Sequence, residues 1–156
     1  MKTCNNASGR LAGLLCAGLM MAATAQAAFA DEIRIKMLDK SDSGTLAFEP
    51  GFVKVNPGDT IVFEPTQMGG HSSFSLLVPL GAQAWSGAPD KEVRVRLDKE
   101  GVYIYECAAH KMMGMAGVIL VGKPVNLDEA RKAAKTESAK FVLNKDRLEM
   151  ELGQVK

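Results

Sequence analysis

The chain has 156 residues, of which 47% are hydrophobic and 24% charged, a composition typical of one globular domain and not of a disordered or fibrous protein. Its 19 basic and 18 acidic residues nearly balance. Because the sequence contains no Lys- or Arg-rich run, we expect no nucleic-acid role.

The first 30 residues are typical of a secretory signal peptide. Lys2 and Arg10 supply positive charge, residues 11–30 are apolar and rich in alanine, and residues 28–30 offer a small-x-small cleavage site. We predict cleavage after Ala30, export to the periplasm and no membrane insertion of the mature chain. A retained membrane anchor is the alternative interpretation.

Residues 31–122 contain a series of short segments with the two-residue period of β-strands. Ile33, Ile35 and Met37 alternate with Arg34 and Lys36, which indicates a strand with one buried face. About eight such strands separated by turn residues predict an all-β sandwich or barrel. Comparable segments follow at residues 46–48, 52–55, 60–63, 93–97, 102–107 and 117–121.

Residues 123–156 change to a helical pattern and predict a C-terminal extension of two helices packed on the β-sandwich. Asn126 is expected to cap the first helix, with Glu129 as its partner three residues later. A second helical stretch is expected from about Ser138 to Leu152. The apolar face of the first helix is predicted to contain Leu127, Ala130, Ala133 and Ala134.

Cysteine and histidine are scarce in the expected mature chain. Removal of the signal peptide leaves Cys107 as its single cysteine, so no internal disulfide can form. His110 follows three residues after Cys107 and Met115 eight residues after it, while His71 lies in a separate glycine-containing loop. Each residue alone has an ordinary role in a core or at a surface, but together they predict a metal site.

One thiolate, two imidazoles and a weak thioether form the ligand set of a blue copper site. Zinc is the competing metal, because a Cys-His-His site could bind it with a water molecule. The loop after Cys107 has no carboxylate to act as a base on that water, and Glu106 is expected to point away from Cys107. We therefore favour copper, with no catalytic residues.

The segment Cys107-x-x-His110-x-x-x-x-Met115 resembles the C-terminal copper loop of the cupredoxins. Residues 48–50, the turn at residues 57–60 and the helices after Pro124 resemble pseudoazurin. The resemblance implies an eight-stranded Greek-key sandwich with one type 1 copper ion. It also implies a monomeric periplasmic electron carrier, with a redox partner such as copper nitrite reductase or a cytochrome. The implied metal ligands are His71, Cys107, His110 and Met115.

Several departures from the family pattern bear on the site, one of them a stretch between His71 and Cys107 that is shorter than expected. Ser72 stands where the family usually has an asparagine that joins the two ligand loops. Ala109 replaces a proline, so its N–H is expected to donate a hydrogen bond to the Cys107 sulfur or else to face solvent. Acidic residues outnumber basic ones in residues 31–122, although Lys40, Lys91 and Lys111 could contribute to a basic docking ring.

A different functional class stays open beside electron transfer. Methionine-rich loops are typical of copper carriers, and Met112, Met113 and Met115 form such a loop, so a periplasmic copper-binding or delivery protein is the alternative. The thiolate of Cys107 argues against it, because delivery is better served by exchangeable thioethers. An enzyme is the weakest interpretation, since no further histidine is left for a second copper site.

Overall fold

The computed structural model describes residues 30–156, so the predicted signal peptide lies outside the described residues except for Ala30. Eight strands are followed by two helices near the C-terminus, and a short 3-10 turn, η1 (Lys111–Met113), precedes the last strand. The strands are β1 (Glu32–Ser41), β2 (Gly44–Glu49), β3 (Phe52–Val55), β4 (Thr60–Pro65), β5 (Phe74–Leu77), β6 (Val93–Arg96), β7 (Gly101–Glu106) and β8 (Ala116–Val121). The helices are α1 (Leu127–Ser138) and α2 (Arg147–Leu152).

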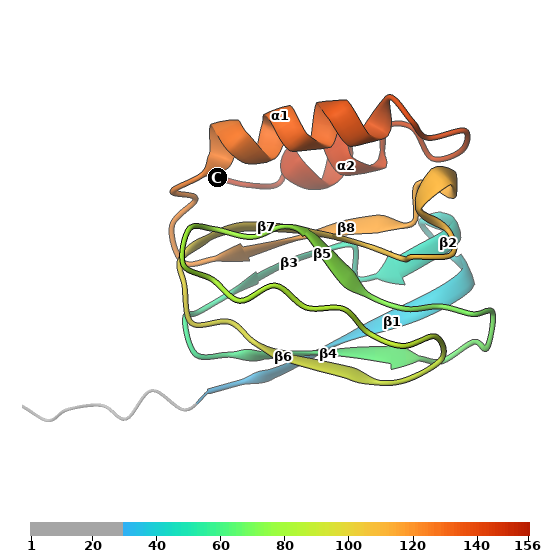
Figure 1. The fold of residues 1–156 in the computed structure, drawn as a ribbon, viewed down its shortest axis with the longest axis horizontal. Helices are drawn as coiled ribbons and strands as arrows, with labels where there is room; N and C mark the ends of the chain where they lie inside the picture. Colours follow the sequence, from blue (N-terminus) through green and yellow to red (C-terminus); the bar gives the residue numbers. More distant parts are fainter. Residues whose placement is uncertain (1–29) are drawn as a thin grey trace, which may run out of the picture.

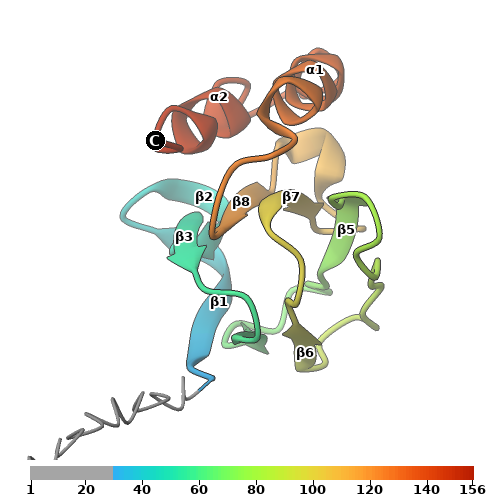
Figure 2. The same cartoon turned by 90° about the vertical axis from the view of Figure 1, so that its left-hand side faces the viewer.

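The strands form two four-stranded sheets packed face to face (Figures 1 and 2). One sheet has the order β2-β1-β4-β6 and the other β3-β8-β7-β5. The pairs β1·β4 and β3·β8 are parallel while the remaining pairs are antiparallel. Parallel neighbours require the chain to cross between sheets, as in a Greek key. The predicted all-β sandwich with two C-terminal helices is confirmed.

β7 and β8 are buried along their whole length because they are covered on both faces. On β7, Tyr103 and Tyr105 face the interior between the sheets, while Val102 and Ile104 face the helices. This double burial explains why these two strands are almost continuously apolar and do not alternate with polar residues. It also makes β7 a rigid support for the residue that follows it, Cys107.

Aromatic side chains fill the space between the sheets. The ring centroids of Phe48 and Tyr105 lie 4.8 Å apart, and those of Phe63 and Tyr105 lie 4.9 Å apart, both edge to face. Trp85 stacks on Phe63 with a centroid distance of 5.9 Å. Edge-to-face and stacked pairs at these distances add directional contacts to apolar burial.

α1 and α2 lie side by side over the outer face of the sheet that contains β7 and β8 (Figure 1). The predicted apolar face of α1 is present: Ala130 and Ala134 are buried against that sheet, with Leu127 and Ala133 partly buried there. None of the helices among the described residues combines the length and apolar character needed to cross a membrane.

Two predictions about the helical extension are wrong. The side chain of Asn126 makes no capping hydrogen bond. Instead it accepts a hydrogen bond from the N–H of Val102 at 2.7 Å and donates one to the carbonyl of Val102 at 3.0 Å. The second helix begins at Arg147 and not near Ser138. Residues 139–146 form a loop, and Phe141 within it is buried against the sheet without being helical.

Candidate metal centre

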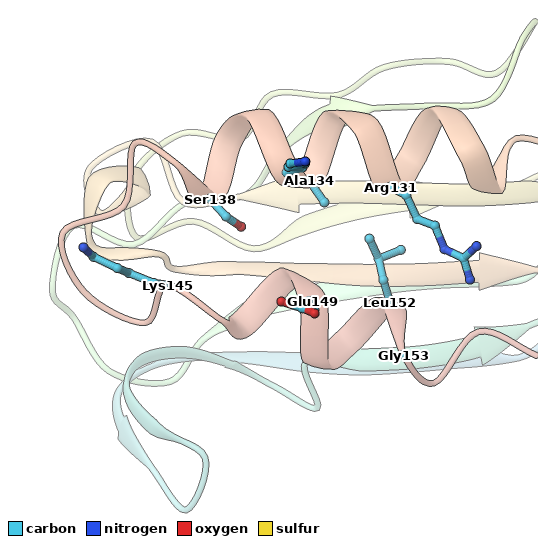
Figure 3. A pocket seen from close by; sticks show the side chains of 8 residues that line it. Arg131, Ala134, Ser138, Lys145, Glu149, Leu152 and Gly153 are labelled. Atoms are coloured by element: carbon cyan, nitrogen blue, oxygen red, sulfur yellow. The ribbon is translucent and has the colours of Figure 1, made fainter.

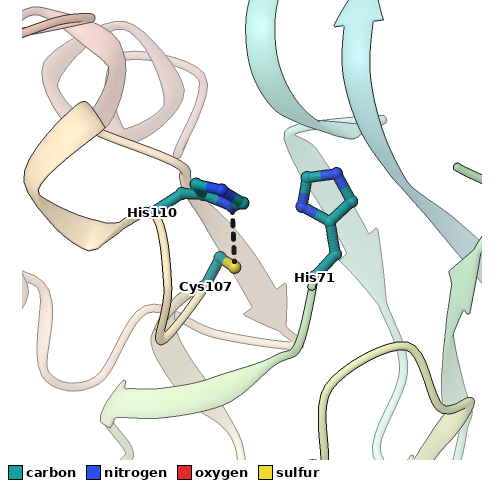
Figure 4. A group of neighbouring side chains, drawn as sticks. All are labelled: His71, Cys107 and His110. Carbon is teal, nitrogen blue, oxygen red and sulfur yellow. Dashed lines mark hydrogen bonds between the residues drawn. The ribbon is translucent and has the colours of Figure 1, made fainter. Parts of the chain in front are cut away.

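His71, Cys107 and His110 come together at one end of the sandwich (Figure 4). Cys107 directly follows β7, His110 precedes η1, and His71 lies in the loop before β5. One potential ligand atom from each of the three lies within 4.8 Å of the others. His71 and Cys107 are fully buried, whereas His110 is partly exposed.

The loop from Cys107 to Met115, here called the ligand loop, closes on itself through backbone hydrogen bonds. The N–H of Cys107 donates to the carbonyl of Met115 at 2.9 Å. The carbonyl of His110 accepts from the N–H of Met115 at 3.3 Å. Met115 is fully buried and belongs to the same core cluster as Cys107. These bonds keep the ends of the loop together without help from a metal.

Ser72 joins the two ligand-bearing segments. Its backbone N–H donates to the sulfur of Cys107 at 3.5 Å, and its hydroxyl oxygen accepts from the N–H of Ala108 at 3.3 Å. The serine therefore makes the connection for which the family uses asparagine. Ala109 is exposed, and its N–H makes no hydrogen bond to Cys107 in the described part of the chain. The hydrogen bond expected from Ala109 to the Cys107 sulfur is therefore absent, which leaves the alternative that this N–H faces solvent.

Two aspartates that the sequence analysis did not single out hold His71. The carboxylate of Asp90 accepts hydrogen bonds from the N–H groups of Gly70 and His71, each near 3.0 Å. The carboxylate of Asp39 lies 3.1 Å from Nε2 of His71. Only the folded chain brings Asp39, at the end of β1, to this loop, so no local sequence signal marks it.

The hydrogen bonding of His71 fits a metal ligand. Asp39 can accept a proton held on Nε2, and that tautomer leaves a lone pair on Nδ1. Nδ1 is buried and has no hydrogen-bond partner among the described residues. A buried polar atom without a partner is costly. A soft metal bound beside the Cys107 sulfur would relieve that cost, so the residues present fit copper.

His110 forms the edge of the centre that solvent can reach. Its Nδ1 lies 3.5 Å from the sulfur of Cys107, and its ring centroid lies 4.9 Å from that of His71. Burial, followed by the neighbouring His71, lowers the pKa of His110. A lowered pKa favours the neutral imidazole, which is the form that binds metals. Met112 and Met113 beside it are 46% and 40% exposed.

Glu106 lies on the opposite face of β7 from Cys107, as strand alternation predicts. It is buried under the helix layer, and Oε1 has no hydrogen-bond partner among the described residues. Burial, with the charge of Glu137 as the next cause, raises the pKa of Glu106 to about 7. Its side chain is directed away from the centre and does not serve as a base there.

The family of this chain follows from comparison with known proteins. Residues 35–122 match the model of the copper binding proteins of the plastocyanin/azurin family. The chain belongs to this family. It is 40% identical to the pseudoazurin of Methylorubrum extorquens over 111 residues, which cover 70% of this chain and 75% of the relative. With the pseudoazurin of Paracoccus pantotrophus it shares 33% identity over 144 residues, covering 91% and 96% of the two chains.

The fold of this cupredoxin also matches a solved pseudoazurin. The crystal structure of the native pseudoazurin from Hyphomicrobium denitrificans superposes with a TM-score of 0.71 at 39% sequence identity, covering 80% of this chain and 98% of that one. The resemblance to the cupredoxins, and to pseudoazurin among them, is confirmed. Copper is therefore the metal of this protein, as predicted from the residue types.

A surface cavity of about 560 Å³ lies between the two helices of this cupredoxin (Figure 3). Arg131, Lys145, Glu149 and Leu152 are among the residues that line it, and none of the predicted metal ligands does. His71, Cys107 and His110 instead lie together at the end of the sandwich, away from this cavity.

Proposed function

We propose that this chain carries single electrons in the periplasm, with His71, Cys107, His110 and Met115 as the ligands of one type 1 copper ion. The observation that carries the proposal is the convergence of the first three side chains, with buried Nδ1 of His71 having no hydrogen-bond partner in the described part of the chain. Met115 supports the set because its backbone bonds to Cys107 and it is fully buried beside it.

Copper bound here would supply a one-electron couple between Cu(II) and Cu(I). The protein contributes a ligand arrangement that is held before metal binds. The N–H of Ser72 donates to the thiolate of Cys107, and Asp39 accepts from the ring of His71. The aromatic core packs against β7, the strand that precedes Cys107. Rigid ligands reduce the rearrangement that accompanies a change of charge, which favours fast electron transfer.

His110 is the proposed route for the electron, because it is the histidine of the centre that reaches the surface. The exposed thioethers of Met112 and Met113 give its surroundings an apolar character. A partner such as a copper nitrite reductase or a respiratory cytochrome would dock there with the monomeric protein. No catalytic acid or base is needed for this role.

Copper delivery is the second candidate, favoured by the exposure of Met112 and Met113. A carrier must release its metal, whereas Cys107 is fully buried in the core. Loss of copper to an excess of a Cu(I) chelator within seconds would support delivery. Retention of copper over hours would support electron transfer.

The visible spectrum of the copper-loaded mature protein tests the proposal directly. Thiolate ligation by Cys107 predicts an intense charge-transfer band in the visible region. The variant Cys107→Ser should lose this band while the copper-free protein stays folded. A colourless copper-loaded wild type would refute the blue-copper assignment.

A further inference from the structure

The loop between α1 and α2, together with the first residue of α2, runs back beside the ligand loop and binds three of its carbonyl groups in succession. The N–H of Val142 donates to the carbonyl of Met112 at 2.8 Å. Nδ2 of Asn144 donates to the carbonyl of Met113, also at 2.8 Å. Nη1 of Arg147 donates to the carbonyl of Gly114 at 2.8 Å. We call Val142, Asn144 and Arg147 the C-terminal clamp.

Arg147 is unusual within this clamp because it is a buried cation bonded to neutral groups. It is 5% exposed, and its guanidinium also donates to the carbonyls of Thr45 and Leu46 in β2. Burying a guanidinium in this way costs free energy that an apolar residue of similar size would not. The planar group does, however, hold several acceptors at fixed angles. Arg147 therefore acts by holding Gly114 in a fixed position relative to β2.

Gly114 allows the clamp to approach the backbone of the ligand loop. Its φ of +67° lies in the left-handed region. A Cβ atom there would lie 2.7 Å from the carbonyl oxygen of Leu143 and 2.9 Å from that of Asn144. Such distances are shorter than real contacts, so the clamp packs directly against the position that precedes Met115.

Met115 is thus held from both sides. Its own N–H and C=O bond to His110 and Cys107, and the carbonyl before it bonds to Arg147. An axial thioether forms a weak, long bond to copper, so the protein and not the metal must decide where it stands. The identity and placement of this ligand are among the factors that tune the reduction potential.

We propose that Asn144 and Arg147 are positioning residues that set where the Met115 thioether stands relative to Cys107 and His110, and thereby the reduction potential. This inference rests on the proposed ligand set. The helical extension, in this view, is a support for the metal centre as well as a cover for the sheet.

The test compares two clamp variants with a matched control. Arg147→Met removes the donors and keeps the length, and Asn144→Gly removes the amide at a residue whose φ is +49°. Asn126→Ala is the control, because it also removes hydrogen bonds from the helical extension, but at Val102, the far end of β7 from Cys107. All variants are made in the full mature chain.

Three measurements separate positioning from mere stability. In the copper-free protein, hydrogen exchange at the amide of Met115 should be roughly tenfold faster in the clamp variants than in the control, when both are compared under conditions of equal global stability. A factor of this size is expected for one lost net hydrogen bond. In the copper-loaded protein, the ratio of the visible absorption bands and the midpoint potential should shift in the clamp variants alone. Arg147→Lys should restore part of both shifts.

The proposal would be overturned if the clamp variants lost global stability but kept the same spectrum, midpoint potential and Met115 amide exchange as the control. If Arg147→Met does not fold, Asn144→Gly decides the question by the same three measurements. A wild type without the intense visible band would instead refute the proposed function, and the exchange measurement on copper-free protein would still test the clamp.

Discussion

Asn126 joins α1 to the sheet, and its replacement distinguishes two roles for an asparagine before a helix. Val102, its partner, is fully buried, and both of its backbone groups bond to the Asn126 amide, at 2.7 and 3.0 Å. Asn126→Ala leaves both groups without these partners. Two lost net hydrogen bonds plus the cost of buried unpaired groups predict a loss of about 2–4 kcal/mol in the free energy of unfolding.

Asn126→Ser is the informative comparison. Serine caps helices about as well as asparagine, but its hydroxyl is too short to replace an amide that bonds both groups of Val102. We therefore expect Asn126→Ser to lose nearly as much stability as Asn126→Ala. Urea unfolding of the copper-free protein, followed by the fluorescence of the single tryptophan, Trp85, measures both losses. If the unfolding free energy of Asn126→Ser lay within about 0.5 kcal/mol of wild type, the stabilising role of the hydrogen bonds to Val102 would be refuted and the capping role would be restored.

Three further outcomes are expected. Leu148→Ala should destabilise by about 2–5 kcal/mol in urea unfolding, because Leu148 is fully buried between α2 and the sheet; a loss below 1 kcal/mol would contradict this packing. Burial raises the pKa of Glu151 above its ordinary 4.5. The folded state therefore binds that proton more tightly than the unfolded state, and the free energy of unfolding falls as pH rises above about 4.5. Glu151→Gln should flatten this slope, and an unchanged slope would show that Glu151 does not cause it. Lys111→Glu should slow electron transfer to an acidic-faced partner, most at low salt, whereas Lys123→Glu, after the far end of β8, should not; equal rates in stopped-flow mixing would exclude this docking face.

The residues that converge at the candidate metal centre and the sandwich could be predicted because residue types and spacing mark them. The expected mature chain has one cysteine and two histidines, and all three come together in the fold. Short strands show themselves by alternation, as at Ile33, Ile35 and Met37. Burial on both faces weakens that alternation in β7 and β8, but their apolar character still indicates strands.

The boundaries of the helical extension were harder to predict from the sequence, because several side chains there form hydrogen bonds to backbone groups far away in the chain. A capping motif at Asn126 is a local pattern, and the same amide is satisfied equally well by Val102 across the sheet. Phe141 supplies the apolar spacing of a helix although it lies in a loop. Periodicity records which side chains are buried, and it does not record the backbone that carries them.

The hydrogen bonds that hold the candidate metal centre in place could not be predicted from the sequence, for a related reason. Its acceptors and donors are largely main-chain groups, such as the carbonyls of Met112, Met113 and Gly114 and the N–H of Ser72. Every residue has a carbonyl, so no residue type marks one that a distant side chain binds. Ser72 illustrates the consequence: it replaces the family's asparagine, yet its N–H and hydroxyl still join the ligand loops. What the centre requires of that position is a donor and an acceptor at the right place, which more than one residue type can supply.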